Sequence, residues 1–361
     1  MPHPLDRADL RSRVQDRIDI ELARWEVELA EIGPDVVDLT SPVRSLLRGG
    51  KRLRAGFAYW GWRAAGREDH EGAISLAASM EFFQAAALIH DDVMDDSDTR
   101  RGRPAMHRAL SQAHTTRGWH GVADDFGAAG AILGGNLCLG WCDDLFADSG
   151  LPATSLTAAR PAFERMRAQL MAGQFLDIVT SMRPWEHLED AERVERARQV
   201  LRYKSAKYSI EHPLLIGATA GGADEQDLET LSCYGLALGE AFQLRDDVLG
   251  VFGDPEVTGK PAGDDLREGK RTVLIARALA GADDAQTERI DQWLGRPDLA
   301  EDEVRDFRAL LVDTGALDSV EADITHGAET ARAALARTLG VPEPARAALD
   351  DLIDVTTARS T

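Results

Sequence analysis

Five aspartates stand directly in front of two adjacent arginines in the segment LIHDDVMDDSDTRRGRP, residues 88–104. Asp91 and Asp95 are four residues apart, so on a helix both carboxylates leave the same face one turn apart. Carboxylates held that close repel each other unless a cation lies between them, and Mg²⁺, which combines few carboxylates with water and phosphate oxygens, fits best. Arg100 and Arg101 follow, with planar guanidinium groups that suit a phosphate. The segment therefore predicts a magnesium-assisted diphosphate site, and the apolar residues before it indicate an apolar tail on that diphosphate.

The alternative for this segment is a solvated acidic loop, which is what most charge runs are. The residues just before it, MEFFQAAALI at 80–89, form an apolar helix that should be buried. Unpaired carboxylates at the end of a buried helix would be costly, so the metal interpretation is favoured.

Two other segments carry a similar chemistry. Residues 49–54, GGKRLR, precede an apolar helix, so their glycines let backbone amides approach an anion while Lys51 and Arg54 share one helix face. Such a turn is common in solvated loops. The anion-binding interpretation is favoured because the chain has a second predicted phosphate site at Arg100 and Arg101. Residues 242–249, FQLRDDVL, form a second apolar helix that ends in paired aspartates, Asp246 and Asp247.

Two polar groups in the middle of the chain remain open to two interpretations. Gln174 and Asp177 are three residues apart in a predicted helix, and they are either hydrogen-bonded core residues or part of the site. Lys204 and Tyr208 share one helix face with Ser205 beside them. They either present a cation and a hydroxyl together or belong to the protein surface.

The elements that position these residues are all predicted to be helices, because the long periodic runs have helical spacing and no segment shows strand alternation. The predicted fold is therefore all-α, with the two aspartate-tipped helices facing a central cavity. We expect a single domain, residues 1–361, with a motif-bearing core at about 49–271 and outer helices at 1–48 and 272–361. The expected core helices are residues 55–65, 77–96, 123–146, 158–180, 191–219 with an interruption around Pro213, and 225–249, and helix 10–32 lies outside them.

Composition narrows the possible partners. A formal net charge of −21 argues against nucleic acid or an anionic membrane surface as the main ligand. Three cysteines without a paired framework suggest a reducing compartment, and Cys138 and Cys142, on one helix face, fit core packing better than zinc. The charged N-terminus is unlike a signal peptide, and no run of about 18 apolar residues stands out. We expect a cytoplasmic protein without a membrane anchor.

The glycine-rich helix 123–146 predicts a close helix contact within or between subunits.

Taken together, these motifs resemble those of the trans-isoprenyl diphosphate synthases, the polyprenyl synthetase family. The resemblance rests on GGKRLR, DDVMD, RR, GQFLD, YKSAKYS and FQLRDD, which begin at residues 49, 91, 100, 173, 203 and 242. It implies an all-α homodimer that joins an allylic diphosphate head to tail to isopentenyl diphosphate with three Mg²⁺ ions. It also implies a short-chain product.

The resemblance also implies a role for particular residues. The metal ligands would be Asp91, Asp95 and Asp246, with Asp247 and Asp264 in support. The allylic diphosphate would be bound by Arg100, Lys204 and Lys260, with Ser205 and Gln243 directing dipoles at the allylic cation. Isopentenyl diphosphate would be held by Gly50, Lys51, Arg54 and Arg101, with Gln84 close by. Lys270 would be a further substrate-binding residue. Two departures are Gly250, where many relatives have a third aspartate, and Ser205, where Thr is frequent.

Product length is expected to depend on the helix before Asp91. Counting back from Asp91, Ala87, Phe83 and Met80 lie on one narrow stripe. Relatives that make short products place bulky aromatics one turn below the first aspartate, where this chain has Ala86 and Ala87. Phe83 would lie roughly 12 Å below Asp91 and form the cavity floor. This depth favours geranylgeranyl diphosphate, with farnesyl diphosphate next.

Two other functions compete with chain elongation. A terpene cyclase shares the first aspartate motif but needs no second diphosphate site, so GGKRLR and the second aspartate pair argue against it. A non-catalytic helical regulatory subunit would have no use for both metal motifs and both basic clusters.

Overall fold

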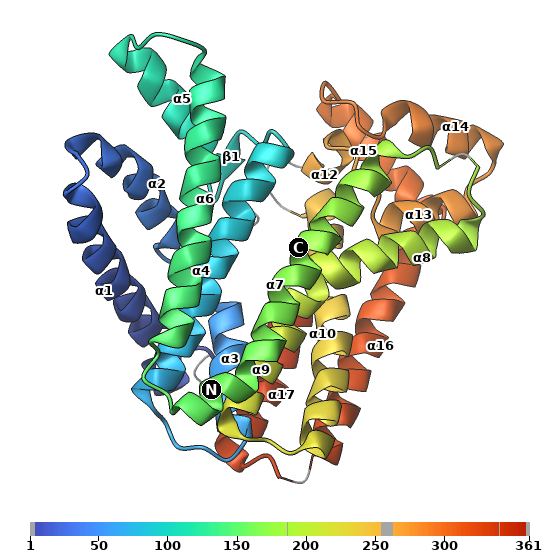
Figure 1. Ribbon diagram of the computed structural model, residues 1–361. Coiled ribbons are helices and arrows are strands. Elements are labelled where there is room, and N and C mark those ends of the chain that lie inside the picture. Colours follow the sequence, from blue (N-terminus) through green and yellow to red (C-terminus); the bar gives the residue numbers. More distant parts are fainter. Residues whose placement is uncertain (1–3, 186, 254–262, 339, 359–361) are drawn as a thin grey trace. The chain divides into compact units, whose positions relative to one another are not determined.

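The computed structural model describes residues 4–185, 187–253, 263–338 and 340–358. Within these residues the regular structure is helical, apart from one antiparallel pair of short strands, β1 (Thr99–Arg100) and β2 (Arg103–Pro104) (Figure 1). The all-α prediction is therefore confirmed. The chain divides into two compact units, Met1–Ala159 with Ile216–Ala223, and Arg160–Leu215 with Asp224–Thr361.

The first unit is built around α4, which packs against α6, α3 and α1. Residues 72–86 of α4 are buried without a break, which is the pattern of a helix enclosed on all sides. Its helices are α1 (Leu10–Ala30), α2 (Val37–Leu47), α3 (Leu53–Ala64), α4 (Glu71–Met94), α5 (Met106–Arg117) and α6 (Ala123–Ala147), with short 3₁₀ turns at Arg7–Asp9 and Pro34–Val36.

The expectation that no segment is long and apolar enough to cross a membrane was wrong for α4. By length and composition this helix passes such a test, and 83% of its most apolar window is buried inside the protein. Such burial is typical of a core helix. The thiols of Cys138 and Cys142, both on α6, are also buried, and burial raises the pKa of Cys138, so the expected core role of these thiols fits.

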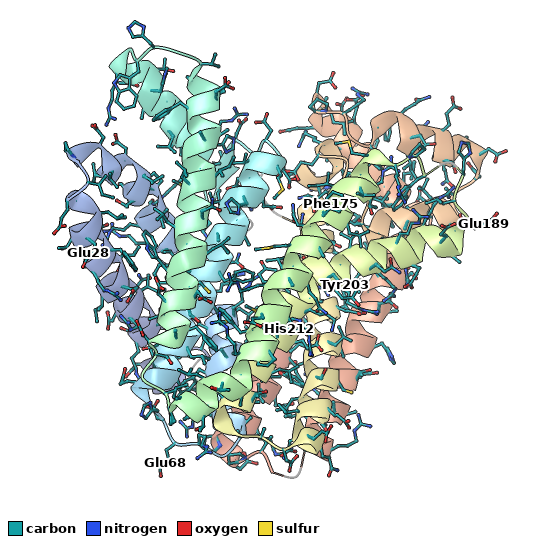
Figure 2. The ribbon with its side chains drawn as sticks, in the orientation of Figure 1. Glu28, Glu68, Phe175, Glu189, Tyr203 and His212 are labelled. Carbon is teal, nitrogen blue, oxygen red and sulfur yellow. The ribbon has the colours of Figure 1, made fainter. Side chains whose placement is uncertain are left out.

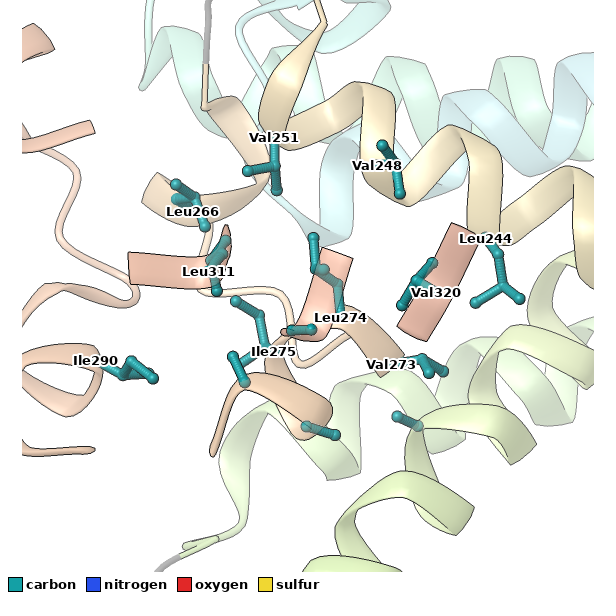
Figure 3. Packing of buried hydrophobic residues seen from close by; sticks show 14 of the residues in the cluster. Leu244, Val248, Val251, Leu266, Val273, Leu274, Ile275, Ile290, Leu311 and Val320 are labelled. Carbon is teal, nitrogen blue, oxygen red and sulfur yellow. The ribbon is translucent and has the colours of Figure 1, made fainter. Parts of the chain in front are cut away.

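The second unit has α10 (Glu225–Phe252) at its centre, packed against a π-helix, α16 and α17. Leu244, Val248 and Val251 of α10 join a cluster with residues of α12, α13, α15 and α16 (Figure 3). Each such side chain contributes about 1.5–3 kcal/mol on burial, so the cluster fixes the aspartate-bearing end of α10. The other helices are α8 (Asp190–Val200), α12 (Asp264–Arg267), α13 (Val273–Gly281), α14 (Asp284–Trp293), α15 (Glu301–Asp313), α16 (Ala316–Arg337) and α17 (Glu343–Thr357).

Two helices run from one unit into the other, α7 (Ala153–Met182) and α9 (His212–Gly221). The predicted interruption around Pro213 takes the form of a change of helix type, because a π-helix continues directly into α9 at His212, one residue before Pro213. The π-helix spans Leu201–Glu211. π-helical turns are frequent at functional sites, and this one carries Lys204 and Ser205.

Candidate active site

Asp91 and Asp95 lie at the C-terminal end of α4, as their spacing predicts. The helix ends at Met94, and the N–H of Asp95 still donates to the Asp91 carbonyl at 2.8 Å. Asp96 then takes a left-handed backbone conformation, φ 53°, which ends the helix. Both Asp91 and Asp95 are partly exposed, so their carboxylates are accessible from outside the core.

Asp92, which the sequence analysis gave no role, is the buried partner of Arg100. Its side chain accepts a hydrogen bond from Arg100 Nε at 2.8 Å and a second one from Nη2. Burial raises the pKa of Asp92, while Arg100 lowers it. The pairing leaves Arg100 Nη2 3.9 Å from Asp91 Oδ2, so Asp92 fixes the arginine beside the first aspartate.

A second basic cluster lies in the same unit, around the loop before α3. Arg101 Nη1 donates to the Leu46 carbonyl at 2.9 Å, and a Cβ added to Gly50 would lie only 3.1 Å from that nitrogen. Burial lowers the pKa of Arg101, Glu81 opposes this, and Arg52, Arg54 and Arg100 lower the pKa further. The structure thus places Arg101 against Gly50, with Arg54 close enough to act on Arg101 electrostatically.

The other predicted residues of the first unit lie along these two segments. Lys51 is exposed in the loop next to Gly50, and Gln84 is buried on α4, seven residues before Asp91. Along the proposed tail-binding stripe, Ala87 is partly exposed, whereas Ala86, Phe83 and Met80 are buried. Exposure along this stripe therefore falls with distance from Asp91, and the chain-length role of these residues stays a prediction.

In the second unit, Lys204 lies on the π-helix and Asp177 on α7. Lys204 Nζ lies 2.6 Å from Asp177 Oδ2, so Asp177 orients this cation. A Cβ on Gly173 would lie 2.5 Å from the backbone N of Lys204, so only glycine lets the two helices approach this closely. Figure 2 shows Phe175, on α7, and Tyr203, on the π-helix. Gln174 lies on α7 one turn before Asp177, and Ser205 is partly buried.

Gln243, Asp246 and Asp247 lie near the C-terminal end of α10. The Gln243 amide donates to Asp247 Oδ1 at 2.8 Å. Burial raises the pKa of Asp247 to about 8, against the Gln243 hydrogen bond, and the nearby carboxylates of Asp265 and Asp246 contribute to the rise. Such crowding of negative charge is what a bound cation would relieve.

Gly250, where many relatives have an aspartate, lies within α10, which continues beyond the predicted helix end at residue 249. A Cβ at this position would lie 1.9 Å from Asp265 Oδ2, so the Asp265 carboxyl occupies the space that a side chain would need. Asp265 Oδ1 in turn lies 3.0 Å from Lys270 Nζ. Asp264, which the sequence analysis favoured, is the first residue of α12, and Lys260 lies outside the described residues.

The carboxylates fit Mg²⁺ by their chemistry. Asp91 and Asp95 supply a hard oxygen pair on one helix face, and Asp246 and Asp247 supply two further carboxylates on adjacent residues of α10. Among the described residues, no three acidic, histidine or cysteine side chains are arranged to hold a metal by themselves. Mg²⁺ suits such pairs because it keeps several waters and completes its octahedron with substrate phosphates.

An all-α protein with aspartate pairs and separate basic clusters is of the class expected to act on diphosphates, and comparisons with known proteins identify the family. The family model described as polyprenyl synthetase matches residues 37–311. A geranylfarnesyl diphosphate synthase of Aeropyrum pernix is 34% identical over 91% of this chain and 96% of its own length. A (2E,6E)-farnesyl diphosphate synthase of Mycobacterium bovis is 30% identical over 84% of this chain and 78% of its own length.

The fold agrees with a solved structure of the same family. The crystal structure of a geranylgeranyl pyrophosphate synthase from Corynebacterium glutamicum, complexed with isoprenyl diphosphate and magnesium, superposes with a TM-score of 0.91. The two are 40% identical, and the match covers 97% of this chain and 99% of that one. The chain therefore belongs to the polyprenyl synthetase family and is a trans-isoprenyl diphosphate synthase, a prenyltransferase of isoprenoid biosynthesis that makes short-chain prenyl diphosphates.

Proposed function

We propose that this enzyme elongates an allylic diphosphate with isopentenyl diphosphate to geranylgeranyl diphosphate, using three Mg²⁺ ions. The observation that carries the condensation is the pair of basic sites in the first unit. Arg100 lies beside Asp91, while Arg101 lies against Gly50 in the loop before α3. Two such sites suit two diphosphates, whereas a cyclase needs one.

In this proposal each unit contributes one aspartate motif to metal binding. Asp91 and Asp95 hold Mg²⁺ from α4, and Asp246, supported by Asp247, holds it from α10. Where many relatives have a third aspartate in the second motif, this chain has Gly250, and the carboxyl of Asp265 occupies the space beside it. The family model spans residues 37–311 and thus both units, which supports a single domain over residues 1–361.

Residues of both units are proposed to bind and ionise the allylic diphosphate. Arg100, fixed by Asp92, and Lys204, fixed by Asp177, bind the allylic diphosphate, together with Lys260. When bound, Mg²⁺ neutralises the diphosphate and makes it a leaving group. As the allylic C–O bond breaks, Ser205 and Gln243 direct their dipoles at the cation in a site from which water is excluded.

The second substrate completes the reaction without an enzyme nucleophile. Gly50, Lys51, Arg54 and Arg101 hold isopentenyl diphosphate so that its alkene attacks the allylic carbon and a new C–C bond forms. A proton then leaves the adjacent carbon, and the released diphosphate accepts it. Gln84 and Lys270 contribute to holding the two substrates. The products are the lengthened allylic diphosphate and diphosphate.

The direct test is to incubate the purified protein with Mg²⁺, isopentenyl diphosphate and each allylic diphosphate in turn, and to identify the products by mass spectrometry. We expect geranylgeranyl diphosphate as the main product. Release of diphosphate without isopentenyl diphosphate would instead indicate a cyclase. A main product of farnesyl or geranylfarnesyl diphosphate would leave the condensation intact and correct the chain length.

The division between the two diphosphate sites gives a separate prediction. Lys51→Ala should raise the KM for isopentenyl diphosphate about tenfold, the loss expected for one charged hydrogen bond, with little change in the KM for the allylic substrate. Steady-state kinetics with each substrate varied in turn measures both constants. An equal rise in the two constants would show that the sites are divided wrongly.

We also propose that the enzyme is a cytoplasmic homodimer, paired through α6. This helix exposes Ile132 by 46% and Leu133 by 56%, with Ala129 on the same face, and exposed apolar stripes of this kind mark interaction surfaces. A second copy of the chain would cover them. Leu133→Glu should shift the dimer to monomer in sedimentation, whereas Val312→Glu, on an isolated exposed residue of α15, should not.

A further inference from the structure

Arg52, the last residue of the loop before α3 and the N-cap of that helix, has a left-handed backbone conformation and a buried side chain. Its φ is 54°, a left-handed value that costs a non-glycine residue of order 1 kcal/mol. Its side chain is buried and forms an ion pair with the equally buried Glu81 of α4, Nη1 to Oε2 at 2.9 Å. Burying such an ion pair gains little stability over apolar packing, so stability alone does not explain why these two residues are buried together.

Glu81 also fixes the start of α3. While one carboxylate oxygen pairs with Arg52, the other accepts the backbone N–H of Ala55 at 3.3 Å. This amide belongs to the first turn of α3, where N–H groups have no partner inside the helix and where negative charge is favourable. Glu81 of α4 therefore contacts both Arg52 and the first turn of α3, the turn that contains Arg54.

Gln15 of α1 holds the other end of the loop. Its side-chain oxygen accepts the N–H of Gly49 at 3.1 Å and Arg52 Nη2 at 2.5 Å. Arg52 Nη2 also donates to the carbonyl of Leu47, the last residue of α2. Through Gly49 and Arg52 the loop is thus hydrogen-bonded to the end of α2, to α1 and to α4.

Lys51 and Arg54 lie between these ties, one on each side of Arg52. A loop of glycines and basic residues would otherwise sample many conformations, and its cations would repel each other. Holding its backbone in one conformation before the ligand arrives removes that ordering cost from binding. Glu81 also offsets the positive charge gathered here, since it raises the pKa of Arg101 against the effect of burial.

We propose that Arg52, Glu81 and Gln15 are positioning residues for isopentenyl diphosphate, which hold the loop so that Lys51 and Arg54 meet its diphosphate in the correct geometry. The proposal rests on the function proposed above. None of the three contacts the substrate, so their effect is on the affinity for one substrate and not on the chemical step.

The test is Glu81→Gln, which keeps the size of the side chain and an oxygen for the Ala55 N–H but removes the charge that holds Arg52. We expect the KM for isopentenyl diphosphate to rise about tenfold, as for one lost charged hydrogen bond, with kcat and the allylic KM little changed. Calorimetric titration of isopentenyl diphosphate alone should show the same loss of affinity.

Glu21→Gln is the matched control. Glu21 is a second buried glutamate of the first unit, and it accepts hydrogen bonds from Arg17 at 3.0 Å, Arg24 at 3.2 Å and Trp25 at 3.0 Å. Its substitution should lower the melting temperature comparably while leaving the KM for isopentenyl diphosphate unchanged. If both variants raise this KM equally, the effect is loss of stability and the proposal is overturned.

Gln15→Ala tests the other tie and serves where Glu81→Gln fails to fold, since Gln15 is only partly buried. It should raise the same KM to a smaller extent. An unchanged KM in Gln15→Ala and in any folded Glu81→Gln protein, against a parent enzyme that elongates normally, would overturn the positioning role alone. A parent enzyme that neither binds isopentenyl diphosphate nor elongates would overturn the proposed function, and the positioning role with it.

Discussion

Asp91→Asn should lower turnover by about a thousandfold or more while leaving the fold intact. Each metal bond to the leaving diphosphate supplies several kcal/mol of transition-state stabilisation, and every 1.36 kcal/mol is a factor of ten in rate. Asp91 is partly exposed at the end of α4, so an amide of the same shape leaves the packing of residues 72–86 untouched. Asp246→Asn, at the end of α10, should behave in the same way.

The measurements are kcat at saturating substrates, the Mg²⁺ concentration for half-maximal rate, and the melting temperature with and without allylic diphosphate and Mg²⁺. Asp313→Asn, an exposed aspartate of α15, is the control for a change in net charge. In the parent and the control, substrate and Mg²⁺ should raise the melting temperature, because a ligand that binds only the folded state stabilises it. Near-normal turnover in both motif variants at the Mg²⁺ concentration used for the parent enzyme would contradict the assignment of Asp91 and Asp246 as metal ligands.

The sequence was sufficient to predict the helices that carry the motifs, because each has a long apolar period and a motif at its end. Buried stretches such as residues 72–86 produce a strong periodic signal, and the all-α fold follows from several of them. Boundaries were less well predicted. Gly250 lies inside α10 because residues after Leu249 still pack in the core, where Val251 is fully buried.

The partners of the charged residues could not be predicted in this way. Asp92 with Arg100, Asp177 with Lys204, and Glu81 with Arg52 are pairs between different elements, and spacing within one helix says nothing about them. Glu81 shows the difficulty well. It stands in the apolar run MEFFQAAALI, where a lone carboxylate should have been read as needing a buried cation, since burial without one is costly.

The π-helix at Leu201–Glu211 was missed for a similar reason. Its residues have an ordinary helical composition, and Pro213 offered a more obvious point of irregularity. What sets the π-helix apart is its neighbours, since Gly173 of α7 and Gly239 of α10 let backbones approach it from two helices. Such close approach depends on packing between helices of the unit, and its only sign in the sequence is a few isolated glycines.

A paired substitution on α4 should change the length of the product in opposite directions. Ala87, one turn before Asp91, is partly exposed, whereas Phe83, one turn further, is 2% exposed. A helix rises about 1.5 Å per residue, which puts Phe83 roughly 12 Å below Asp91. Ala87→Phe should therefore fill the space beside the growing tail and give farnesyl diphosphate or a shorter product. Phe83→Ala should remove the floor and give a longer product.

The readout is the product distribution by mass spectrometry, with isopentenyl diphosphate in excess and the same allylic primer for all proteins. Loss of the Phe83 ring also leaves a core cavity that costs about 3–5 kcal/mol, so Phe83→Leu is the milder companion and should lengthen the product with less damage. Phe82→Leu is the matched control, since Phe82 is equally buried on α4 but points away from the stripe toward Trp141, with ring centres 6.0 Å apart. This control should destabilise the protein and leave the product unchanged. If Ala87→Phe and Phe83→Leu both give the product of the parent enzyme, α4 does not set the chain length, and the floor must be sought on another helix.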